Sequence, residues 1–325
     1  MIKIIYINRS IKNGAYSFEG LFTTIKKNLK GCSYEDFYSK TKSNFLSDIF
    51  ALNKKSTNIY HITGGLGYYS FFLPKNKTIL TIHDTNHYEH DLTGIKKIIF
   101  GLLYFKLPAS QVKYITVVSK HTKSRLVKLF KISESKIIVI NNCYSNEFKK
   151  VEKREIHSPA KILHIGTKNN KNLIRLISAL DQLDVKLTII GKLNTLQKQH
   201  LKNSNIDYIN KYNLTDKEIY QEYINTDILA FISLYEGFGL PIIEANAVGR
   251  AIITSNTSPM SDIAGDSACM VNPYDVKDIQ NGIEKLISNQ KFRLKIIDNG
   301  YINLKKFSPT ETTSMYIKLY KKMSL

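Results

Sequence analysis

The sequence predicts an α/β protein made of two doubly wound, Rossmann-like domains. Short apolar runs rich in β-branched residues recur along the chain, and a helical pattern follows most of them. Strands that alternate with helices form parallel sheets. The runs fall into two groups of five on either side of 148–161, a charged segment that contains Pro159 and lacks apolar periodicity. A chain of 325 residues suffices for two such domains, which we expect to face each other across a cleft.

The expected elements follow in chain order. Strands are expected at 2–7, 58–62, 78–82, 114–118 and 136–140, and in the second group at 161–165, 186–190, 227–232, 251–254 and 268–271. Helices are expected at 119–130, 170–180, 215–224, 239–248, 275–288 and 307–323. Ser119, Thr215 with Glu218, and Asp275 indicate helix starts, because their side chains can cap backbone N–H groups. The predicted domains are 1–152 and 153–305, followed by a terminal helix at 306–325.

The chain is strongly basic, with 47 Lys and Arg against 27 Asp and Glu and a formal net charge of +20. Residues 1–157 hold 26 of the basic and 11 of the acidic side chains, so the first half carries most of the positive charge. Such a field favours a polyanion or an anionic membrane surface as a partner. A lysine-rich surface that only keeps the protein in solution explains the composition equally well.

The cysteines and the apolar runs indicate in which cellular compartment the protein is found. Cys32, Cys143 and Cys269 lie far apart, which indicates free thiols in a reducing compartment. The N-terminal MIKIIYIN is typical of a strand and lacks the pattern of a secretory signal peptide. The longest apolar run, at 98–105, is far shorter than the ~20 residues of a membrane-spanning helix. We therefore expect a cytoplasmic protein, with peripheral binding to the inner face of the membrane as an option.

The segment YEGFGLPIIEA (235–245) carries a pair of carboxylates around a turn. Glu236 closely follows an expected strand, and the two glycines after it allow a tight turn that brings the backbone close to a ligand. The amide groups of 238–240 then form an anion site suited to a diphosphate at the start of the next helix. Glu244 lies one turn into that helix, where it can accept hydrogen bonds from sugar hydroxyls.

The stretch SLYEGFGLPIIEANAVGRAIITSNTSPMSDIAGDSACMVNPYDVKDI (233–279) resembles the C-terminal signature of retaining glycosyltransferases of family 4, which have the GT-B fold. The residues 117–142, 162–180 and 305–320 are similar to further parts of that family: the end of its first domain, the start of its second domain, and a terminal helix that crosses back to the first. The resemblance implies the GT-B fold and the transfer of a sugar from a nucleotide-sugar to an acceptor hydroxyl.

The resemblance also implies roles for individual residues. Glu236 would bond hydroxyl groups of the donor sugar, and Glu244 would bond the ribose. Lys171 would neutralise the donor diphosphate, a role that suits a compact ammonium group. Further donor-binding candidates are Gly14, Thr167, Gly237, Phe238, Gly239 and Leu240.

Three loops depart from the family pattern, and in one of them Asp262 stands where glutamate is common. Asn170 and Thr167 stand where the family often has arginine. Either binding of the diphosphate is weaker for this reason, or Lys168 or Lys192 supplies the missing charge. The loop at 8–20 keeps Gly14 but lacks the double glycine often seen there, which puts its contact with the donor in doubt.

The segment TIHDTNHYEHD (81–91) supports two interpretations. Its histidines and aspartates are metal-ligand types, although no regular helix is assured to align them. The family resemblance instead implies that His83, which follows a strand, bonds the sugar and positions the reacting centre. Candidates for the acceptor side are Tyr16, Asp84 and His87.

No Asp-x-Asp motif occurs, which agrees with a metal-independent mechanism in which lysine and helix N-termini act on the diphosphate. We therefore expect no metal and no cofactor other than the nucleotide-sugar co-substrate. The candidate catalytic residues are His83, Lys171 and Glu236.

Two further segments have less specific patterns. IKKIIFGLLYFKLP (95–108) is favoured as a helix packed on the first sheet, because apolar stripes usually face the core. Its lysines allow the alternative that it binds a membrane surface. TGGLGYYS (63–70) lacks the third glycine of a dinucleotide fingerprint and indicates a loop that allows close backbone approach.

Together these patterns predict a retaining, metal-independent glycosyltransferase of the hexosyltransferase type that acts in cell-surface polysaccharide or lipopolysaccharide assembly. Its partners would be a nucleotide-sugar donor and a glycan or lipid-linked glycan acceptor. Two alternatives remain: a nucleotide-sugar epimerase or hydrolase of the same fold, and a non-catalytic partner of another glycosyltransferase. Charge alone also allows a nucleic-acid-binding protein, although we expect no nucleic-acid partner.

Overall fold

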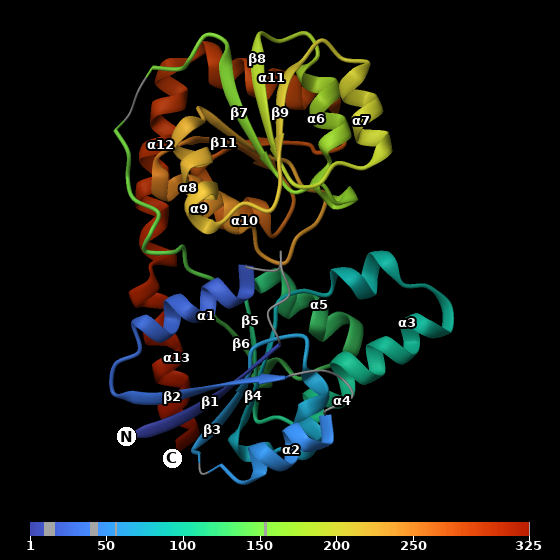
Figure 1. The fold of residues 1–325 in the computed structure, drawn as a ribbon, viewed down its shortest axis with the longest axis vertical. Helices are drawn as coiled ribbons and strands as arrows, with labels where there is room; N and C mark the ends of the chain where they lie inside the picture. Colours follow the sequence, from blue (N-terminus) through green and yellow to red (C-terminus); the bar gives the residue numbers. More distant parts are fainter. Residues whose placement is uncertain (10–16, 40–44, 56, 153–154, 325) are drawn as a thin grey trace. The chain divides into compact units, whose positions relative to one another are not determined.

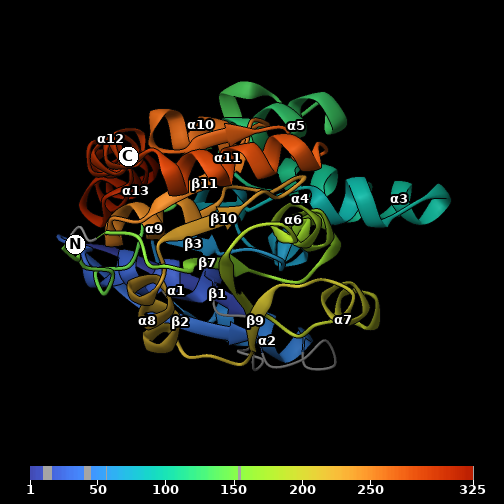
Figure 2. The same cartoon turned by 90° about the horizontal axis from the view of Figure 1, so that it is seen from above.

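The computed structural model describes residues 1–9, 17–39, 45–55, 57–152 and 155–324. The chain forms two compact units: unit 1 comprises Met1–Cys143 together with Pro309–Leu325, and unit 2 comprises Tyr144–Ser308. Each unit contains a six-stranded sheet whose strand pairs are all parallel, with helices packed against it (Figure 1; Figure 2 shows the same elements from above). The predicted class, α/β with two doubly wound parallel sheets, is confirmed.

In unit 1 the strands lie in the order β2-β1-β3-β4-β5-β6. Their bounds are β1 Ile2–Arg9, β2 Cys32–Ser39, β3 Ile59–Ile62, β4 Thr78–Ile82, β5 Tyr114–Val117 and β6 Ile137–Val139. The α-helices are α1 Ser17–Lys27, α2 Phe45–Asn53, α3 Gly94–Gly101, α4 Leu107–Ser110, α5 Lys120–Phe130 and α13 Pro309–Ser324. Shorter helical turns are η2 Gly67–Phe72, η3 Lys75–Lys77, η4 His87–Asp91, η5 Leu102–Lys106 and η6 Glu134–Lys136.

In unit 2 the strands lie in the order β12-β11-β10-β7-β8-β9. Their bounds are β7 Ala160–Ile165, β8 Val185–Ile190, β9 Asp207–Lys211, β10 Ile228–Phe231, β11 Ala251–Ser255 and β12 Cys269–Val271. The α-helices are α6 Leu173–Leu180, α7 Thr195–Lys202, α8 Asp216–Asn225, α9 Leu240–Val248, α10 Met260–Ala264, α11 Val276–Ser288 and α12 Gln290–Asn303. Shorter turns are η7 Asn169–Lys171, η8 Gly265–Ser267 and η9 Leu304–Phe307.

All ten predicted strands are present, and the predicted helix starts are capped as expected. Ser119 accepts a hydrogen bond from the backbone of Thr122, and Asp275 caps α11. Thr215 and Glu218 form a complete capping box at the start of α8. These signals are local, so they can be recognised without knowledge of the rest of the fold.

The structure contains two strands that the sequence patterns do not predict, β2 and β9. Each is the outermost strand of its sheet. Their sequences, CSYEDFYS and DYINK, carry charged and exposed residues, because an edge strand is only partly covered by the rest of the sheet. The continuous apolar run that marks a central parallel strand is therefore absent from both.

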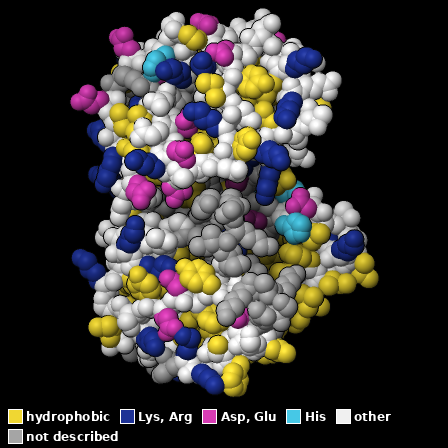
Figure 3. Space-filling model, viewed as in Figure 1, with side chains coloured by type: hydrophobic (Ala, Val, Ile, Leu, Met, Phe, Trp, Pro, Cys, Tyr) yellow, Lys and Arg dark blue, Asp and Glu magenta, His cyan; other side chains and the backbone are white. Residues whose placement is uncertain are grey.

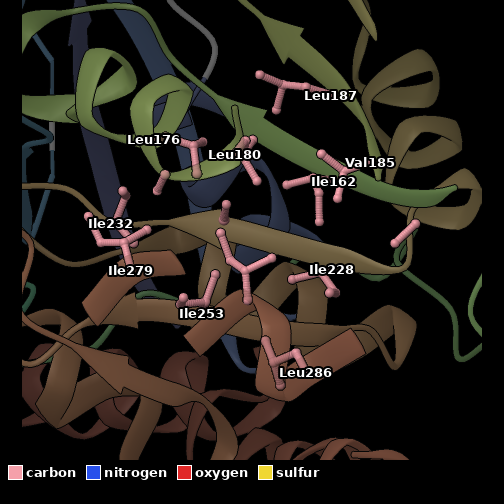
Figure 4. Close-up of a cluster of buried hydrophobic side chains, with 14 of the residues drawn as sticks. Ile162, Leu176, Leu180, Val185, Leu187, Ile228, Ile232, Ile253, Ile279 and Leu286 are labelled. Carbon is pink, nitrogen blue, oxygen red and sulfur yellow. The ribbon is translucent and has the colours of Figure 1, made fainter. Parts of the chain in front are cut away.

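One large cluster in the core of unit 2 lies between one face of its sheet and helices that include α6 and α11. Ile162, Ile228 and Ile253 come from the neighbouring strands β7, β10 and β11 and share one cluster with Leu180 of α6 and Leu286 of α11 (Figure 4). Each of these side chains is completely buried. Side chains of this size stabilise a fold by about 1.5–3 kcal/mol each when they leave water, so this cluster fixes the strand ends that carry polar residues.

The terminal helix α13 packs within unit 1. Its Tyr320 hydroxyl lies 3.0 Å from the hydroxyl of Tyr6 on β1 and 2.7 Å from Nδ1 of His61 on β3. The other ring nitrogen of His61 lies 2.7 Å from the Thr81 hydroxyl on β4. Burial, with a smaller contribution from nearby His83, lowers the pKa of His61 to about 3, so the ring is neutral at physiological pH. A buried polar network therefore ties α13 to three strands.

The apolar segment 95–108 is only partly packed, which corrects the favoured prediction. It continues from α3 through η5 into α4, and Phe105 and Ala109 on one side are buried. Ile95 and Ile98 on the other side are 73% and 70% exposed. The periodic pattern cannot reveal this, because both faces of the helix are apolar. No helix in the described ranges combines the length and the apolarity needed to cross a membrane.

Candidate active site

The strand order of unit 2 brings two of the predicted residues together. Lys171 follows β7 and Glu236 follows β10, and these two strands are neighbours at the point where the strand order of the sheet reverses. Open α/β sheets bind ligands at such a switch point, beyond the carboxyl ends of the strands. Residues that are 65 positions apart in the sequence therefore share one site.

Lys171 and Glu236 form a short, half-buried ion pair. The Lys171 ammonium donates to Oε1 of Glu236 at 2.6 Å, and the Asn170 amide lies 3.2 Å from the same oxygen. The ammonium also lies 4.8 Å from the centre of the Phe231 ring. A Cβ atom at Gly166, whose φ is +96°, would come within 2.9 Å of the Lys171 side chain. Gly166 is thus needed for the position of this lysine.

The turn after Glu236 leads directly into α9. Gly239 has a φ of +111° and is the N-cap of this helix, and Leu240 is its first residue. Phe238 is buried and lies edge-on to Phe307, with ring centres 5.8 Å apart. The first turn of a helix presents backbone N–H groups and the positive end of the helix dipole, and Gly237 to Leu240 lie at this end of α9.

Glu244 lies further along α9 and is held by a residue that the sequence patterns do not identify. The Tyr223 hydroxyl of α8 donates to Glu244 Oε2 at 2.7 Å. Burial raises the pKa of Glu244 to about 7, although the Tyr223 bond opposes the shift; the charge of Asp216 adds to it. Tyr223 itself is fully buried. No local pattern marks such a tyrosine, because its partner is on another helix.

Thr167, in the loop after β7, makes hydrogen bonds to residues that follow β8. Its hydroxyl donates to the backbone oxygen of Lys192 at 2.8 Å, and its backbone oxygen accepts from the Gln197 side chain at 2.7 Å. A Cβ atom at Gly191 would lie 2.9 Å from Thr167 Cγ2. These contacts fix the loops after β7 and β8 to each other.

Unit 1 contains a cavity of about 460 Å³ at the carboxyl ends of its own strands. Its polar wall includes Asn8 near the end of β1, the loop Thr63–Gly65 after β3, and His83 and Asp84 after β4. Its aromatic wall is formed by Tyr88, Phe100, Tyr104 and Phe105. The order β1-β3-β4 places these loops side by side, because the strand order of this sheet reverses between β1 and β3.

His83 is buried and held against the loop after β3. Its Nε2 lies 2.7 Å from the backbone oxygen of Thr63, which fixes the ring and makes this nitrogen the donor. Gly64 has a φ of +141°, and a Cβ atom there would lie 2.7 Å from the His83 ring. The expectation that this glycine loop allows close approach of the backbone is confirmed, and the group that approaches is His83.

The other predicted acceptor-side residues have different surroundings. Asp84 Oδ1 accepts from the backbone of Asn86 at 2.9 Å and lines the cavity. His87 also lines the cavity, and its exposed Nδ1 lies 2.9 Å from Oδ2 of Asp91. Gly14 and Tyr16 fall outside the described residues. Within the described ranges, no group of three or more His, Cys, Asp or Glu side chains is placed to hold a metal ion.

The aromatic wall is a further element that the sequence patterns do not predict. Phe100 and Tyr104 stack with ring centres 4.2 Å apart, and His87 lies edge-on to Phe100 at 5.1 Å. Stacked rings present a flat face that suits the apolar face of a sugar or a hydrocarbon chain.

Comparison with known proteins shows which proteins this chain resembles. Residues 145–303 match the family model described as glycosyl transferases group 1. The chain is 24% identical over 280 residues to the O-antigen chain mannosyltransferase B of Escherichia coli, a match that covers 78% of this chain and 72% of that protein. It is 33% identical over 105 residues to the serotype-specific mannosyltransferase WbdA of Escherichia coli. That second match covers 32% of this chain and only 13% of WbdA.

Solved structures resemble the fold over nearly its whole length. The structure of HepE from Anabaena, in complex with UDP and glucose, aligns with a TM-score of 0.78 at 13% identity and covers 99% of this chain and 100% of that chain. The crystal structure of a glycosyltransferase from Rickettsia africae aligns with a TM-score of 0.77 at 18% identity and covers 99% and 98%. The chain therefore has the two-domain α/β GT-B fold.

Proposed function

We propose that this protein is a retaining glycosyltransferase of the family 4 type, which transfers a sugar from a nucleotide-sugar to an acceptor hydroxyl. The observation that carries the proposal is the pair formed by Lys171 and Glu236 beside the N-terminus of α9, at the switch point of unit 2. A cation and a set of backbone amides are what a leaving diphosphate requires. A neighbouring carboxylate is what neutral sugar hydroxyls require.

The proposed chemistry assigns one task to each group. In the transition state, negative charge grows on the diphosphate oxygen that leaves the anomeric carbon. Lys171 and the first-turn amides of α9 stabilise this charge, and they do so more strongly in the transition state than in the bound donor. Glu236 accepts hydrogen bonds from hydroxyls of the donor sugar. With these groups acting on the diphosphate, we propose that the reaction proceeds without a metal ion.

The remaining residues bind and orient. We propose that Glu244 accepts hydrogen bonds from the ribose, and that His83 positions a sugar in the cavity of unit 1. The acceptor is proposed to be a glycan or lipid-linked glycan of cell-surface polysaccharide or lipopolysaccharide assembly. The similarity to mannosyltransferases, one of them an O-antigen chain enzyme, supports this class of acceptor. Cytoplasmic localisation, with peripheral binding to the inner face of the membrane, is part of the same proposal.

The test is the thermal stability of the protein with UDP, GDP, ADP and CMP in turn. A ligand that binds only the folded state stabilises it by about 2.7 kcal/mol at a hundred times its dissociation constant. We expect one nucleotide to raise the melting temperature, and Glu244→Ala to reduce this rise. The control is Glu134→Ala, which changes an exposed glutamate of unit 1.

Turnover separates the alternatives. A transferase releases its nucleoside diphosphate from the matching nucleotide-sugar much faster when an acceptor glycan is present. A hydrolase or epimerase turns over equally fast without the acceptor. If none of the four nucleotides changes the melting temperature, the donor site does not bind nucleotides and the proposal fails.

A further inference from the structure

The helical segment formed by α3, η5 and the start of α4 exposes an apolar stripe. Its members are Ile95, Ile98, Ile99, Leu102 and Leu103, which are 73%, 70%, 50%, 42% and 45% exposed. They occupy positions i, i+3, i+4, i+7 and i+8 of the helical segment, so they lie on one face of it. Figure 3 shows hydrophobic side chains along the edge of unit 1 where Figure 1 places α3. We name this set of five residues the apolar stripe.

The opposite face of the same helix is firmly packed. Phe105 stacks on Phe130 of α5 with ring centres 4.6 Å apart, and Tyr88 lies edge-on to Phe130 at 4.8 Å. Gly101 is buried here, and a Cβ atom on it would come within 2.7 Å of the Tyr88 ring. The inner face therefore fixes the orientation of the helix. The outward direction of the apolar stripe is a property of the folded unit, since the aromatic contacts prevent the helix from turning inward.

The sequence around the stripe is basic. Between Asp91 and Glu134 the sequence contains no acidic residue and nine basic residues: Lys96, Lys97, Lys106, Lys113, Lys120, Lys123, Arg125, Lys128 and Lys131. Lys96 and Lys106 lie on the exposed side of the helical segment itself. An apolar face bordered by lysines is typical of a helix that lies in the interface of an anionic bilayer.

We propose that the apolar stripe and the lysines beside it form a docking surface for an anionic lipid bilayer. The isoleucine and leucine side chains enter the boundary between headgroups and acyl chains, and Lys96 and Lys106 contact lipid phosphates. A second copy of this chain is the less favourable occupant. The net charge of +20 and the basic sequence around the stripe would make two copies repel each other.

The docking surface and the cavity of unit 1 share one helix. Phe100 and Tyr104 line the cavity, whereas Ile98 and Leu102 belong to the stripe. Docking would thus bring one wall of the cavity to the membrane, where a lipid-linked acceptor would be found. This consequence rests on the proposed function, and the docking surface assigns residues to the membrane binding proposed there; the vesicle test itself does not depend on sugar transfer.

Co-sedimentation with vesicles tests the proposal on the full chain. The vesicles contain phosphatidylethanolamine with phosphatidylglycerol, and vesicles of phosphatidylcholine alone are the uncharged comparison. We expect the wild type to bind the anionic vesicles, and Ile98→Asp to weaken this binding roughly ten- to a hundredfold. The matched control is Leu196→Asp, which places the same charge at a residue of α7 in unit 2 that is 53% exposed, and it should bind as the wild type does.

A second pair of variants tests the lysines. Lys96→Gln combined with Lys106→Gln should weaken binding to anionic vesicles by roughly fivefold per lysine and reduce its dependence on salt. Lys217→Gln, at an exposed lysine of α8, should leave both unchanged.

Three results would overturn the docking surface. The first is equal binding of the wild type and Ile98→Asp, and the second is equal binding to both kinds of vesicle. The third is a wild-type dimer in analytical ultracentrifugation that Ile98→Asp dissociates, without vesicle binding by either protein, which would assign the stripe to a second copy. The nucleotide-dependent melting temperature is recorded for every variant. Its persistence in Ile98→Asp shows that the variant is folded, and its absence in all proteins would count against the proposed function alone.

Discussion

At the scale of single residues, the candidate donor site contains a partly buried ion pair. Lys171 and Glu236 lie in contact, with side chains only 20% and 14% exposed. Partly buried pairs lose more when one partner is removed than exposed pairs do, because the remaining charge is left without compensation. Lys186 and Asp207 form an ion pair of 3.0 Å on the surface of the same unit, with exposures of 36% and 63%, and so provide a matched comparison.

Replacement of these two lysines should separate function from surface charge. We expect Lys171→Ala to lower kcat/KM for the nucleotide-sugar by about a hundredfold, since it removes a cation from the developing negative charge. Lys186→Ala should change kcat/KM little, because exposed pairs contribute about 0–1 kcal/mol. Steady-state kinetics with the donor found by thermal shift provides the measurement. An equal decrease for both variants would contradict a specific role of Lys171.

Because the pKa of Glu244 is raised, we expect the stability of the protein to depend on pH. Its pKa is raised from 4.5 to about 7 by burial, so the folded state holds this proton more tightly than the unfolded chain. As pH rises from about 4.5 to about 7, the unfolded chain loses the proton first and the free energy of unfolding decreases. Glu244→Gln should remove this decrease, and Glu134→Gln should not. Urea unfolding at several pH values measures the free energy of unfolding. If this free energy changes with pH in the same way in the wild type and in Glu244→Gln, the shifted pKa is contradicted.

At the scale of elements, α13 shows how a terminal segment is attached to a sheet. The helix covers a cluster that includes Tyr6 and Ile79, and its Tyr320 hydroxyl joins β1 to β3 through hydrogen bonds. Apolar contacts provide most of the stabilisation of such a helix. The hydrogen bonds specify its position, because buried polar atoms must find their partners.

Removal of one hydroxyl tests this attachment. Tyr320→Phe keeps the ring but leaves the His61 Nδ1 and Tyr6 hydroxyl without this partner. We expect it to lower the free energy of unfolding by about 1–3 kcal/mol. Tyr212→Phe, at a tyrosine that is 57% exposed, should have little effect. Urea unfolding followed by circular dichroism compares them, and an unchanged midpoint for Tyr320→Phe would show that the network does not stabilise the fold.

At the scale of the whole molecule, the chain consists of two units with separate cores. The large cluster of unit 2 draws only on residues between Ala160 and Ile297, whereas two other clusters draw only on unit 1. Unit 1 is discontinuous, because α13 returns to it after the whole of unit 2. Units with their own cores can unfold independently, and a single two-state transition is then not expected.

Calorimetry examines this independence and the location of the donor site together. We expect two thermal transitions, and we expect the stabilising nucleotide to raise only one of them, since a ligand stabilises the unit that binds it. Lys171→Ala should reduce the shift of that transition and leave the other one in place. A single transition whose calorimetric and van 't Hoff enthalpies agree would contradict independent units.

The sequence by itself determined the features that are encoded locally. Central strands such as β4 and β10 appear as buried apolar runs, and the capping residues mark the starts of α5, α8 and α11. The glycine turn marks the start of α9. Each of these signals lies within a few consecutive residues, so no knowledge of the fold is needed to find it.

Only the tertiary structure decided which of these signals meet. Strand order places Lys171 against Glu236, and helix packing places the Tyr223 hydroxyl on Glu244. Packing of α3 and η5 on the Tyr88–Phe130 aromatic cluster turns Phe100 toward the cavity and Ile98 toward solvent, although the sequence pattern allows either face to be buried. Contacts between distant segments depend on the packing of whole elements, which a local pattern does not contain.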